Sequence, residues 1–332
     1  MTSTRKTVRG LALAGALAIT LAACSSQGGA QDEAGGGGGG TGGSVDTERY
    51  AIAMITHEAP GDTFWDKIRA GAEDAAQALN VELRYANNPE APEQATLVQN
   101  AVDTRVDGLA VTLAFADAVG PSLQAANAAE IPVVAFNSGI EQYEQYGAMM
   151  YFGSDETLAG RTAGERIGES GGGKTICIVQ EQGSVALEAR CEGVAAGSGN
   201  SEVLNVDGED LPSVRATIGA KLQQDPSITH IVTLGAPIAL AALEAKGDSG
   251  SQAEVVTFDL NAEVAQRIQD GDIVFSIDQQ PYVQGYMAVQ SLWMYLSNGN
   301  DIGGGGPVLT GPSFVDETNI EQILPYAQNN TR

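Results

Sequence analysis

The chain has 332 residues, of which 43% are hydrophobic and 18% charged, and its formal net charge at pH 7 is −25. This excess of carboxylates argues against nucleic acid as a partner, because contact with phosphates requires basic patches. It also argues against adhesion to anionic lipid head groups. It does not exclude a neutral ligand, since an acidic surface mainly keeps a protein soluble.

The N-terminus has the parts of a bacterial export signal. Three basic residues precede an apolar stretch from Leu11 to Ala23, which is too short to span a bilayer as a helix. The stretch ends in Leu21-Ala-Ala-Cys24, which resembles the lipobox of bacterial lipoproteins, whose cysteine is lipidated. We therefore predict a signal peptide over residues 1–23, a lipid on Cys24 and an extracytoplasmic protein anchored to the cell membrane. The alternative is an ordinary export signal with a chance cysteine.

A flexible tether is predicted after the signal. Ser25 to Ser44 contains six consecutive glycines, Gly35 to Gly40, and no apolar residue large enough to build a core. Such chain behaves as a flexible coil. We assign residues 24–48 to the lipidated cysteine and the tether, and expect the folded part to begin near Arg49. The remainder is long enough for two lobes at roughly 100–200 residues per domain.

From Tyr50 onward, short apolar runs rich in β-branched residues alternate with longer stretches of helical periodicity. The first run is Tyr50–Ile55, and Asp62–Asn80 then shows an apolar face at helical spacing. Further strands are predicted at Val81–Tyr85, Val106–Leu113, Pro132–Phe136, Ala148–Phe152, Lys174–Val179, Val203–Val206, Thr229–Leu234, Glu254–Phe258 and Ile273–Ile277. Continuous apolar runs are typical of parallel strands covered on both faces. The pattern predicts an α/β protein with two doubly wound parallel sheets.

Catalytic and cofactor motifs find little support. The segment Gly168–Thr175 matches a phosphate-loop pattern, but a predicted helix precedes its glycines and a strand follows them. A phosphate loop requires the opposite order, so these glycines are interpreted as a helix end and a turn. The histidines, His57 and His230, lie far apart in sequence, and no serine lies in a nucleophile-elbow pattern. We expect no enzyme activity, no metal and no cofactor.

The loops that follow the strands are the expected binding elements, because doubly wound sheets bind ligands outside the carboxyl ends of their strands. The first such loop brings Phe64 and Trp65 to the start of a helix for which Asp62 is a suitable N-cap. Sugar rings stack their C–H faces on aromatic side chains while their hydroxyls pair with carboxylates and amides. A carbohydrate-type site is indicated, with core packing of one aromatic as the alternative.

Two charged residues follow later strands. Arg190 has five donors that suit hydroxyls or a carboxylate, although a surface ion pair with Glu188 or Glu192 is also possible. Asp259 follows a buried strand and could accept two hydroxyl hydrogen bonds, or cap a helix that begins at Asn261. Both roles of Asp259 are compatible.

Besides Cys24, the chain has two cysteines, Cys177 and Cys191. An even pair in an exported protein suggests a disulfide. Two buried free thiols are the alternative.

At this point the pattern resembles a known family. The motifs that carry the resemblance are Phe64-Trp65 with Gly71, Val106-Asp-Gly-Leu109, Ile131-Pro-Val-Val134, Gly153-Ser-Asp155, Arg190 with Glu192-Gly193, Val255–Asp259, and Ile277–Pro281. From about Arg49 to about Asn298 the chain looks like the type I periplasmic sugar-binding proteins, the group of the ribose-binding protein. The resemblance implies two lobes, three crossover segments and a ligand cleft that closes like a hinge.

The resemblance also implies ligand-binding positions. Phe64, Trp65, Arg190, Asp259 and Gln279 match residues that the family uses, and Asp62 falls near one of them. Two pairs depart from the family pattern: Asn137-Ser138 replaces an Asp-Arg pair, and Gly235-Ala236 replaces an Asn-Asp pair. These departures place ribose specificity in doubt. The predicted ligand contacts are Asp62, Phe64, Trp65, Asn137, Ser138, Arg190, Asp259 and Gln279, with His57, Glu58, Asp155, Glu181 and Gly235 as additional candidates.

The resemblance divides the folded chain into an N-terminal lobe (49–153 and 281–308), a C-terminal lobe (154–280 and 309–325) and a tail (326–332). The expected crossings lie near Gly153-Ser154, Gln280-Pro281 and Gly303–Gly306. The implied function is that of a monomeric solute-binding lipoprotein of an ABC importer, which delivers a monosaccharide or polyol to a membrane permease.

Three other functions share some of these features. A sensor subunit would present the same ligand to a receptor kinase, and a nucleoside- or autoinducer-binding lipoprotein would share the fold. An enzyme would turn its ligand over. A transcriptional regulator of related fold is excluded by the export signal and the missing N-terminal DNA-binding helices.

Overall fold

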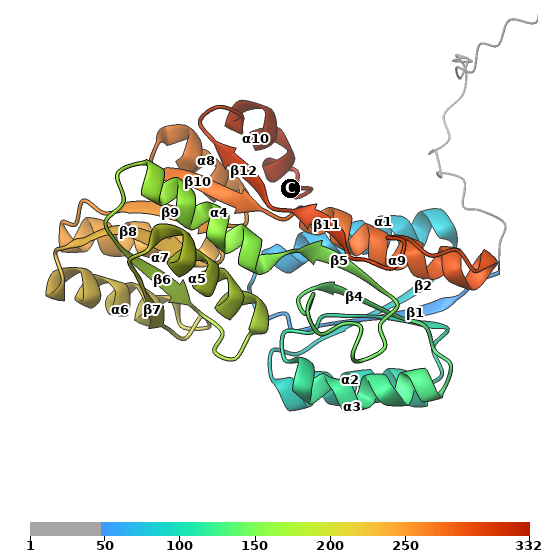
Figure 1. Cartoon of the computed structure of the whole chain (residues 1–332). Coiled ribbons are helices and arrows are strands. Elements are labelled where there is room, and N and C mark those ends of the chain that lie inside the picture. Colours follow the sequence, from blue (N-terminus) through green and yellow to red (C-terminus); the bar gives the residue numbers. More distant parts are fainter. Residues whose placement is uncertain (1–47) are drawn as a thin grey trace, which may run out of the picture. The chain divides into compact units, whose positions relative to one another are not determined.

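The structure, a computed structural model, describes residues 48–332, so the predicted signal peptide, the lipidation site Cys24 and nearly all of the tether lie outside the described residues. The described residues form two six-stranded sheets covered by helices (Figure 1). No helix within residues 48–332 is long and apolar enough to cross a membrane.

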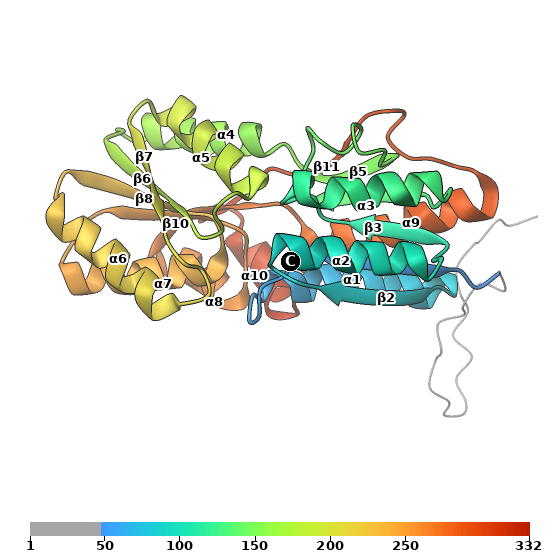
Figure 2. The ribbon, with the colours of Figure 1, turned by 90° about the horizontal axis from the view of Figure 1, so that it is seen from below.

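The first sheet is entirely parallel. Its strands lie in the order β11-β5-β4-β3-β1-β2, with bounds β1 Ala51–Thr56, β2 Glu82–Asn87, β3 Gly108–Val111, β4 Val133–Asn137, β5 Met150–Ser154 and β11 Val308–Gly311. Alternate residues of β1 face opposite sides: Ile52 and Met54 pack with α1 (Phe64–Leu79) and α9 (Pro281–Asn298), whereas Ala53 and Ile55 pack with α2 (Ala91–Asp103) and α3 (Ala116–Ala128). Figure 2 shows α2 and α3 lying side by side. The four inner strands β1, β3, β4 and β5 are therefore buried on both faces, as their apolar runs predict, whereas the edge strands β2 and β11 are partly exposed.

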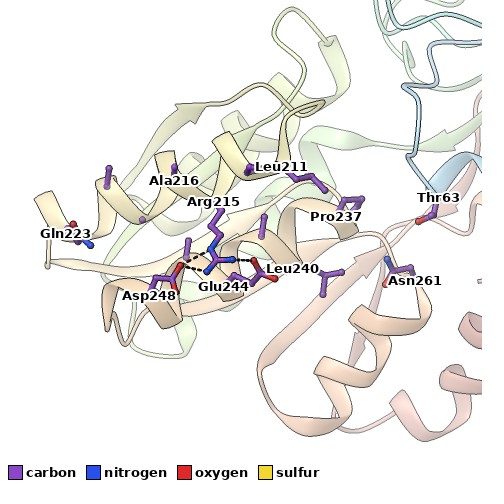
Figure 3. Close-up of a pocket in the computed structure, with 15 residues that line it drawn as sticks. Thr63, Leu211, Arg215, Ala216, Gln223, Pro237, Leu240, Glu244, Asp248 and Asn261 are labelled. Carbon is purple, nitrogen blue, oxygen red and sulfur yellow. Dashed lines mark hydrogen bonds and ion pairs between the residues drawn. The ribbon is translucent and has the colours of Figure 1, made fainter.

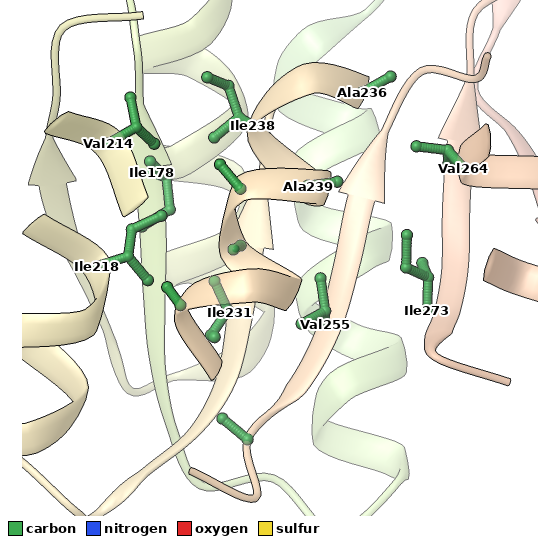
Figure 4. Packing of buried hydrophobic residues seen from close by; sticks show 14 of the residues in the cluster. Ile178, Val214, Ile218, Ile231, Ala236, Ile238, Ala239, Val255, Val264 and Ile273 are labelled. Atoms are coloured by element: carbon green, nitrogen blue, oxygen red, sulfur yellow. The ribbon is translucent and has the colours of Figure 1, made fainter. Parts of the chain in front are cut away.

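The second sheet repeats the plan with one antiparallel edge. Its order is β12-β10-β9-β8-β6-β7, with bounds β6 Lys174–Val179, β7 Ser201–Asn205, β8 Ile228–Thr233, β9 Glu254–Phe258, β10 Ile273–Asp278 and β12 Ser313–Asp316. Helices α4 (Glu156–Glu169) and α5 (Val185–Ser198) cover one face. The other face carries α6 (Leu211–Gln224), α7 (Ala236–Ser249), α8 (Ala262–Asp270) and α10 (Ile320–Gln328). Figure 4 shows this second core, where Ile178, Ile231 and Val255 of the strands pack against helical residues. The predicted fold class is confirmed.

Three differences from the sequence prediction concern local structure. The strands β11 and β12 were not predicted, because they are four residues long, flank Pro312 and include exposed Leu309. The observed N-cap of α1 is Thr63 rather than Asp62, and it makes no side-chain cap hydrogen bond. The Asp62 carboxylate instead accepts the N–H of Phe64 at 3.0 Å, so it still satisfies a donor at the helix start.

The chain crosses between the sheets three times. It does so after β5, after β10, and at Pro312 between β11 and β12. The prediction of the third crossing at Gly303–Gly306 is wrong, because that segment forms a turn between α9 and β11, both of which pack in the first half.

The interpretation of Gly168–Thr175 as a helix end is confirmed. Helix α4 ends at Glu169, the glycines at 171–173 adopt positive φ, and β6 begins at Lys174. The Lys174 ammonium pairs with Asp225 and Glu202. Its positive charge is therefore balanced by carboxylates on the neighbouring strand and loop and is not presented to a phosphate group.

Close packing of α4 on α5 depends on glycines. A Cβ on Gly160 would overlap the backbone carbonyl of Arg190, and a Cβ on Gly193 would overlap the backbone of α4 at Thr157 and Arg161. Helix α5 can therefore approach α4 closely, and this approach places Arg190 of α5 next to the first turn of α4.

We predict that Gly160→Ala destabilises the protein by about 2–3 kcal/mol, because backbone atoms of two packed helices must separate. The matched control is Gly247→Ala in α7, where a Cβ meets nothing within 4 Å; it should stabilise by about 0.5–1 kcal/mol, as Gly-to-Ala does in an open helical position. Urea denaturation measures both. Equal stability of the two variants would contradict the packing described for α4 and α5.

Candidate ligand-binding site

A cavity lies between loops that follow strands of both sheets. Its volume is about 40 Å³, and its lining is His57, Asp62, Phe64, Trp65, Asn137, Ser138, Gln180, Glu181, Ser184, Ala186, Leu187, Arg190, Leu234, Gly235, Asp259 and Gln279. The cavity therefore lies outside the carboxyl ends of the strands, which is where doubly wound sheets bind their ligands.

The structure brings most of the predicted binding residues to this one cavity. All eight principal candidates line it, as do the additional candidates His57, Glu181 and Gly235. Glu58 and Asp155 are not among the lining residues. Glu58 pairs with Arg69 at 2.8 Å and accepts the hydroxyl of Tyr85, while Asp155 caps α4 through the N–H of Leu158. The roles of the lining residues toward a ligand remain predictions.

Aromatic side chains form one wall. Trp65 is almost fully buried at the start of α1, and its ring contacts Phe64 edge-on at a centroid distance of 5.2 Å. The ring of His57 meets Trp65 at 4.7 Å, also edge-on. The aromatics support one another at right angles, an arrangement favoured by their quadrupoles. This packing fixes the ring faces that border the cavity.

Arg190 is the principal cation of the cavity. Its side chain is 4% exposed, and its Nε donates to Glu156 at 2.6 Å. Nη1 donates to the carbonyl of Leu234 at 3.3 Å, and the guanidinium lies over the ring of Phe258. The alternative of a surface ion pair with Glu188 or Glu192 is wrong, because α5 turns Arg190 toward the core and Glu156. Within residues 48–332 no hydrogen bond is made by Nη2, so donors remain for a ligand.

Asp259 faces Arg190 across the cavity. Its Oδ2 lies 3.9 Å from Arg190 Nη1, and its Oδ1 accepts the amide of Gln279 at 2.8 Å. The alternative of a helix cap is wrong, because Asn261 caps α8 with its own side chain, which accepts the N–H of Val264. Asp259 has φ of 65°, a left-handed conformation that is uncommon for non-glycine residues and that Asp and Asn adopt more readily than most.

An amide network joins the two halves of the cavity. Asn137 ends β4, also with φ of 65°, and its Nδ2 lies 3.3 Å from the Oε1 atoms of Gln279 and Gln284. Gln284 Nε2 in turn donates to the Gln279 side chain at 3.0 Å. Gln279 therefore has a fixed amide orientation, with its Nε2 on Asp259. Asn137 and Asp259 occupy corresponding post-strand positions of the two sheets.

His57 is held neutral. Burial lowers the pKa of His57 to about 3, with a further contribution from the nearby Arg190 charge. Its Nδ1 lies 2.8 Å from the Thr112 hydroxyl, whose oxygen accepts the Gln94 amide at 3.0 Å. We assign the His57 proton to Nε2, since the Thr112 hydroxyl can then donate to Nδ1. Nε2 lies 3.8 Å from Glu181, which belongs to the other half of the cavity.

Sequence reasoning missed several residues that hold the site in place, chiefly Glu156, Gln284 and Thr112. Glu156 is fully buried and is the partner of Arg190. Glu156 directly follows Asp155, the candidate that the sequence indicated after β5. Asp155 is the N-cap of α4, whereas Glu156, the first residue of the helix, is the one that is buried. The identity of its partner depends on α4 and α5 packing, which no local pattern specifies.

Two further features bear on the site. A disulfide joins Cys177 of β6 to Cys191 of α5, directly after Arg190. Residues 48–332 contain no group of three or more His, Cys, Asp or Glu side chains that could hold a metal ion.

A larger surface groove lies elsewhere. It lies between α6 and α7 and shares no lining residue with the cavity (Figure 3). Its one arginine, Arg215, is already paired with Glu244 and Asp248. The wall is otherwise mostly small or apolar. This groove has none of the converging donors and acceptors that the cavity offers.

Comparison with known proteins agrees with this geometry. Residues 52–301 match the model of the periplasmic binding protein domain. Among curated proteins, the chain is 23% identical over 298 residues to the xylose/arabinose-binding protein XylF of Sulfolobus acidocaldarius, covering 83% of this chain and 73% of that protein. It is 27% identical over 241 residues to the ribose import binding protein RbsB of Escherichia coli, covering 69% and 79%.

Among solved structures, a carbohydrate transporter from Acidothermus cellulolyticus, crystallised with myo-inositol, is 52% identical with a TM-score of 0.85, covering 86% of this chain and all of that one. The chain belongs to the type I periplasmic sugar-binding protein family. This is a family of extracytoplasmic transport proteins rather than enzymes.

The buried carboxyls predict a pH dependence of stability. Burial raises the pKa of Asp259 to about 7, against the opposing effect of Arg190, and burial together with Asp62 raises that of Glu181 to about 7. Their unfolded values are near 4, so the folded state holds more protons and loses stability as pH rises through about 7. His57 does not oppose this above about pH 6.5, where it is neutral in both states.

We predict that the unfolding free energy of the ligand-free protein falls by about 1 kcal/mol per carboxyl between about pH 6.5 and 8.5. Urea denaturation across this range measures it. The double variant Asp259→Asn, Glu181→Gln should flatten the decline, whereas Glu165→Gln, at an exposed position of α4, should not. A decline of the same size in all three proteins would assign the effect to other groups.

Proposed function

We propose that this protein is the solute-binding lipoprotein of an ABC importer and that it captures a cyclic monosaccharide or polyol of the myo-inositol kind. The observation that supports this most is the convergence of aromatic faces with Arg190, Asp259 and Gln279 on one cavity. Its relative from Acidothermus cellulolyticus, 52% identical, was solved with myo-inositol.

The chemistry suits a ring with many hydroxyls. Each hydroxyl both donates and accepts, so a ring hydroxyl between Arg190 and Asp259 can accept from the guanidinium and donate to the carboxylate. Gln279 and Asn137 add amide groups of fixed orientation. Trp65 and Phe64 offer apolar surface to the C–H face of the ring. Because Arg190 is already paired with Glu156, the ligand need not bring an anion to balance it.

Capture requires no covalent step. The two lobes would close over the ring and exclude water. We propose the bounds 49–153 with 281–311 for the first lobe and 154–280 with 313–325 for the second, because β11 belongs to the first sheet. Exclusion of water strengthens the polar contacts. Contacts across the cleft already exist: His57 faces Glu181, and the N–H of Val185 donates to the carbonyl of Ala114 at 3.1 Å. These contacts support a closed form as an accessible state.

The lipid on Cys24 would retain the protein at the membrane, and the tether would let the closed form reach a permease. We propose that the protein acts as a monomer in this role. The acidic surface suits free diffusion on its tether rather than adhesion to anionic lipid.

We predict that Trp65→Ala and Asp259→Ala each weaken binding of the preferred ring by at least about 1–3 kcal/mol. The first removes apolar contact with the C–H face of the ring, and the second leaves a buried ligand hydroxyl without its acceptor. Isothermal titration against myo-inositol, xylose, ribose, arabinose and glucose measures both the preference and the loss. Trp293→Phe is the matched control, because it alters the other tryptophan, on α9, outside the cavity lining.

Fluorescence separates the two tryptophans. Ligand should change the emission of the Trp293→Phe protein, which retains Trp65, and leave that of Trp65→Phe nearly unchanged. Wild-type affinity in both alanine variants, or no binding of any ring, would refute the proposed site or function.

A further inference from the structure

A second concave region adjoins the cavity. Its volume is about 700 Å³, and its lining includes apolar residues such as Phe115 and Ile238. Four residues line both regions: Asp62, Gln180, Glu181 and Gly235. The larger region, here called the vestibule, is therefore separated from the cavity only by the residues that line both.

The vestibule carries one sign of charge. Its ionisable lining residues are Asp62, Glu90, Glu181, Asp207 and Glu209, and no lysine or arginine lines it. Within residues 48–332, none of these five carboxylates forms an ion pair with a lysine or an arginine. A cleft lined by a single sign of charge concentrates ligands of the opposite sign.

Carboxyl groups also outnumber cations in the lining of the cavity. Its carboxyls are Asp62, Glu181 and Asp259, and its single cation, Arg190, is neutralised through Nε by Glu156 at 2.6 Å. The imidazole nearest to Glu181 belongs to His57, which is uncharged and faces it as an N–H donor. Glu181 thus has no counter-cation from the protein at the junction of cavity and vestibule.

The titration of these carboxyls reflects burial and their mutual repulsion. Burial, the largest cause, raises the pKa of Asp62, Glu181 and Asp259, and the Asp62 charge adds to the elevation at Glu181 and Asp259. The charge of Lys67 acts in the opposite direction on Asp62, as does that of Arg190 on Glu181 and Asp259. Carboxyls that sense one another in this way gain most from a cation placed among them.

We propose that the cleft prefers a cyclic polyol that carries one protonated amino group, an aminocyclitol or amino sugar, to the neutral ring, and excludes rings that carry phosphate or carboxylate. The ring occupies the cavity, and the ammonium lies at the junction between Asp62 and Glu181. This inference rests on the proposed function, because it deepens the ligand class of the same site.

The test compares amines with their neutral parents by isothermal titration of the wild-type protein at low and at physiological salt. The pairs are scyllo-inosamine with scyllo-inositol, and glucosamine with glucose; myo-inositol 1-phosphate is compared with myo-inositol. At least one amine should bind at least about tenfold more tightly than its parent, and more weakly at the higher salt concentration. The phosphate should bind at least about a hundredfold more weakly than myo-inositol.

Variants locate the ammonium. The preference for an amine is the dissociation constant of the neutral parent divided by that of the amine. Asp62→Asn and Glu181→Gln should each reduce this preference about fivefold. Glu165→Gln removes the same charge from an exposed position of α4 and should leave the preference unchanged.

The outcomes separate the two proposals. If no ring binds, the proposed function fails. If neutral rings bind and both amines bind no more tightly than their parents, or the phosphate binds as well as myo-inositol, only the charge preference is refuted. A preference for amines that survives both junction variants, or that falls equally in Glu165→Gln, would also overturn the inference.

Discussion

The buried ion pair between Arg190 and Glu156 is the contact on which the site depends. A guanidinium taken out of water is costly unless a well-placed partner and further hydrogen bonds compensate it. Glu156 supplies the charge, Leu234 a carbonyl and Phe258 a ring face. Once compensated, Arg190 can present its remaining donors to the cavity without attracting an anion. The pair thereby converts a charged residue into a donor for neutral hydroxyls.

The scaffold fixes this pair from several directions. Glycine contacts bring α4, which carries Glu156, close to α5, which carries Arg190. The disulfide from Cys177 attaches α5 to β6 one residue after the arginine. Opposite, Asp259 and Asn137 end their strands in the same left-handed conformation, and Gln279 connects them. Backbone strain at these two positions is offset by the surrounding hydrogen bonds, so the polar groups are arranged before a ligand arrives.

Much of this could be predicted from the sequence. Alternating apolar runs and helical stretches predict two doubly wound sheets, because strands buried on both faces must be apolar throughout. The carboxyl-end rule then selects the loops that carry Trp65, Arg190 and Asp259. Glu156 escaped prediction because its role depends on which helix packs against α4. The short strands around Pro312 escaped because four residues carry too little hydrophobic pattern, and the third crossing was therefore placed too early.

A crystal structure of the protein with the cyclic polyol that it binds most tightly tests directly whether the Arg190–Glu156 pair presents donors to a neutral ring. We expect a ring between Trp65 and Arg190, with hydroxyls within about 2.7–3.2 Å of Arg190, Asp259 and Gln279, a normal hydrogen-bond range. Nε of Arg190 should remain on Glu156. A ligand bound outside this cavity, or an Arg190 that leaves Glu156 to meet the ligand, would contradict this role of the pair.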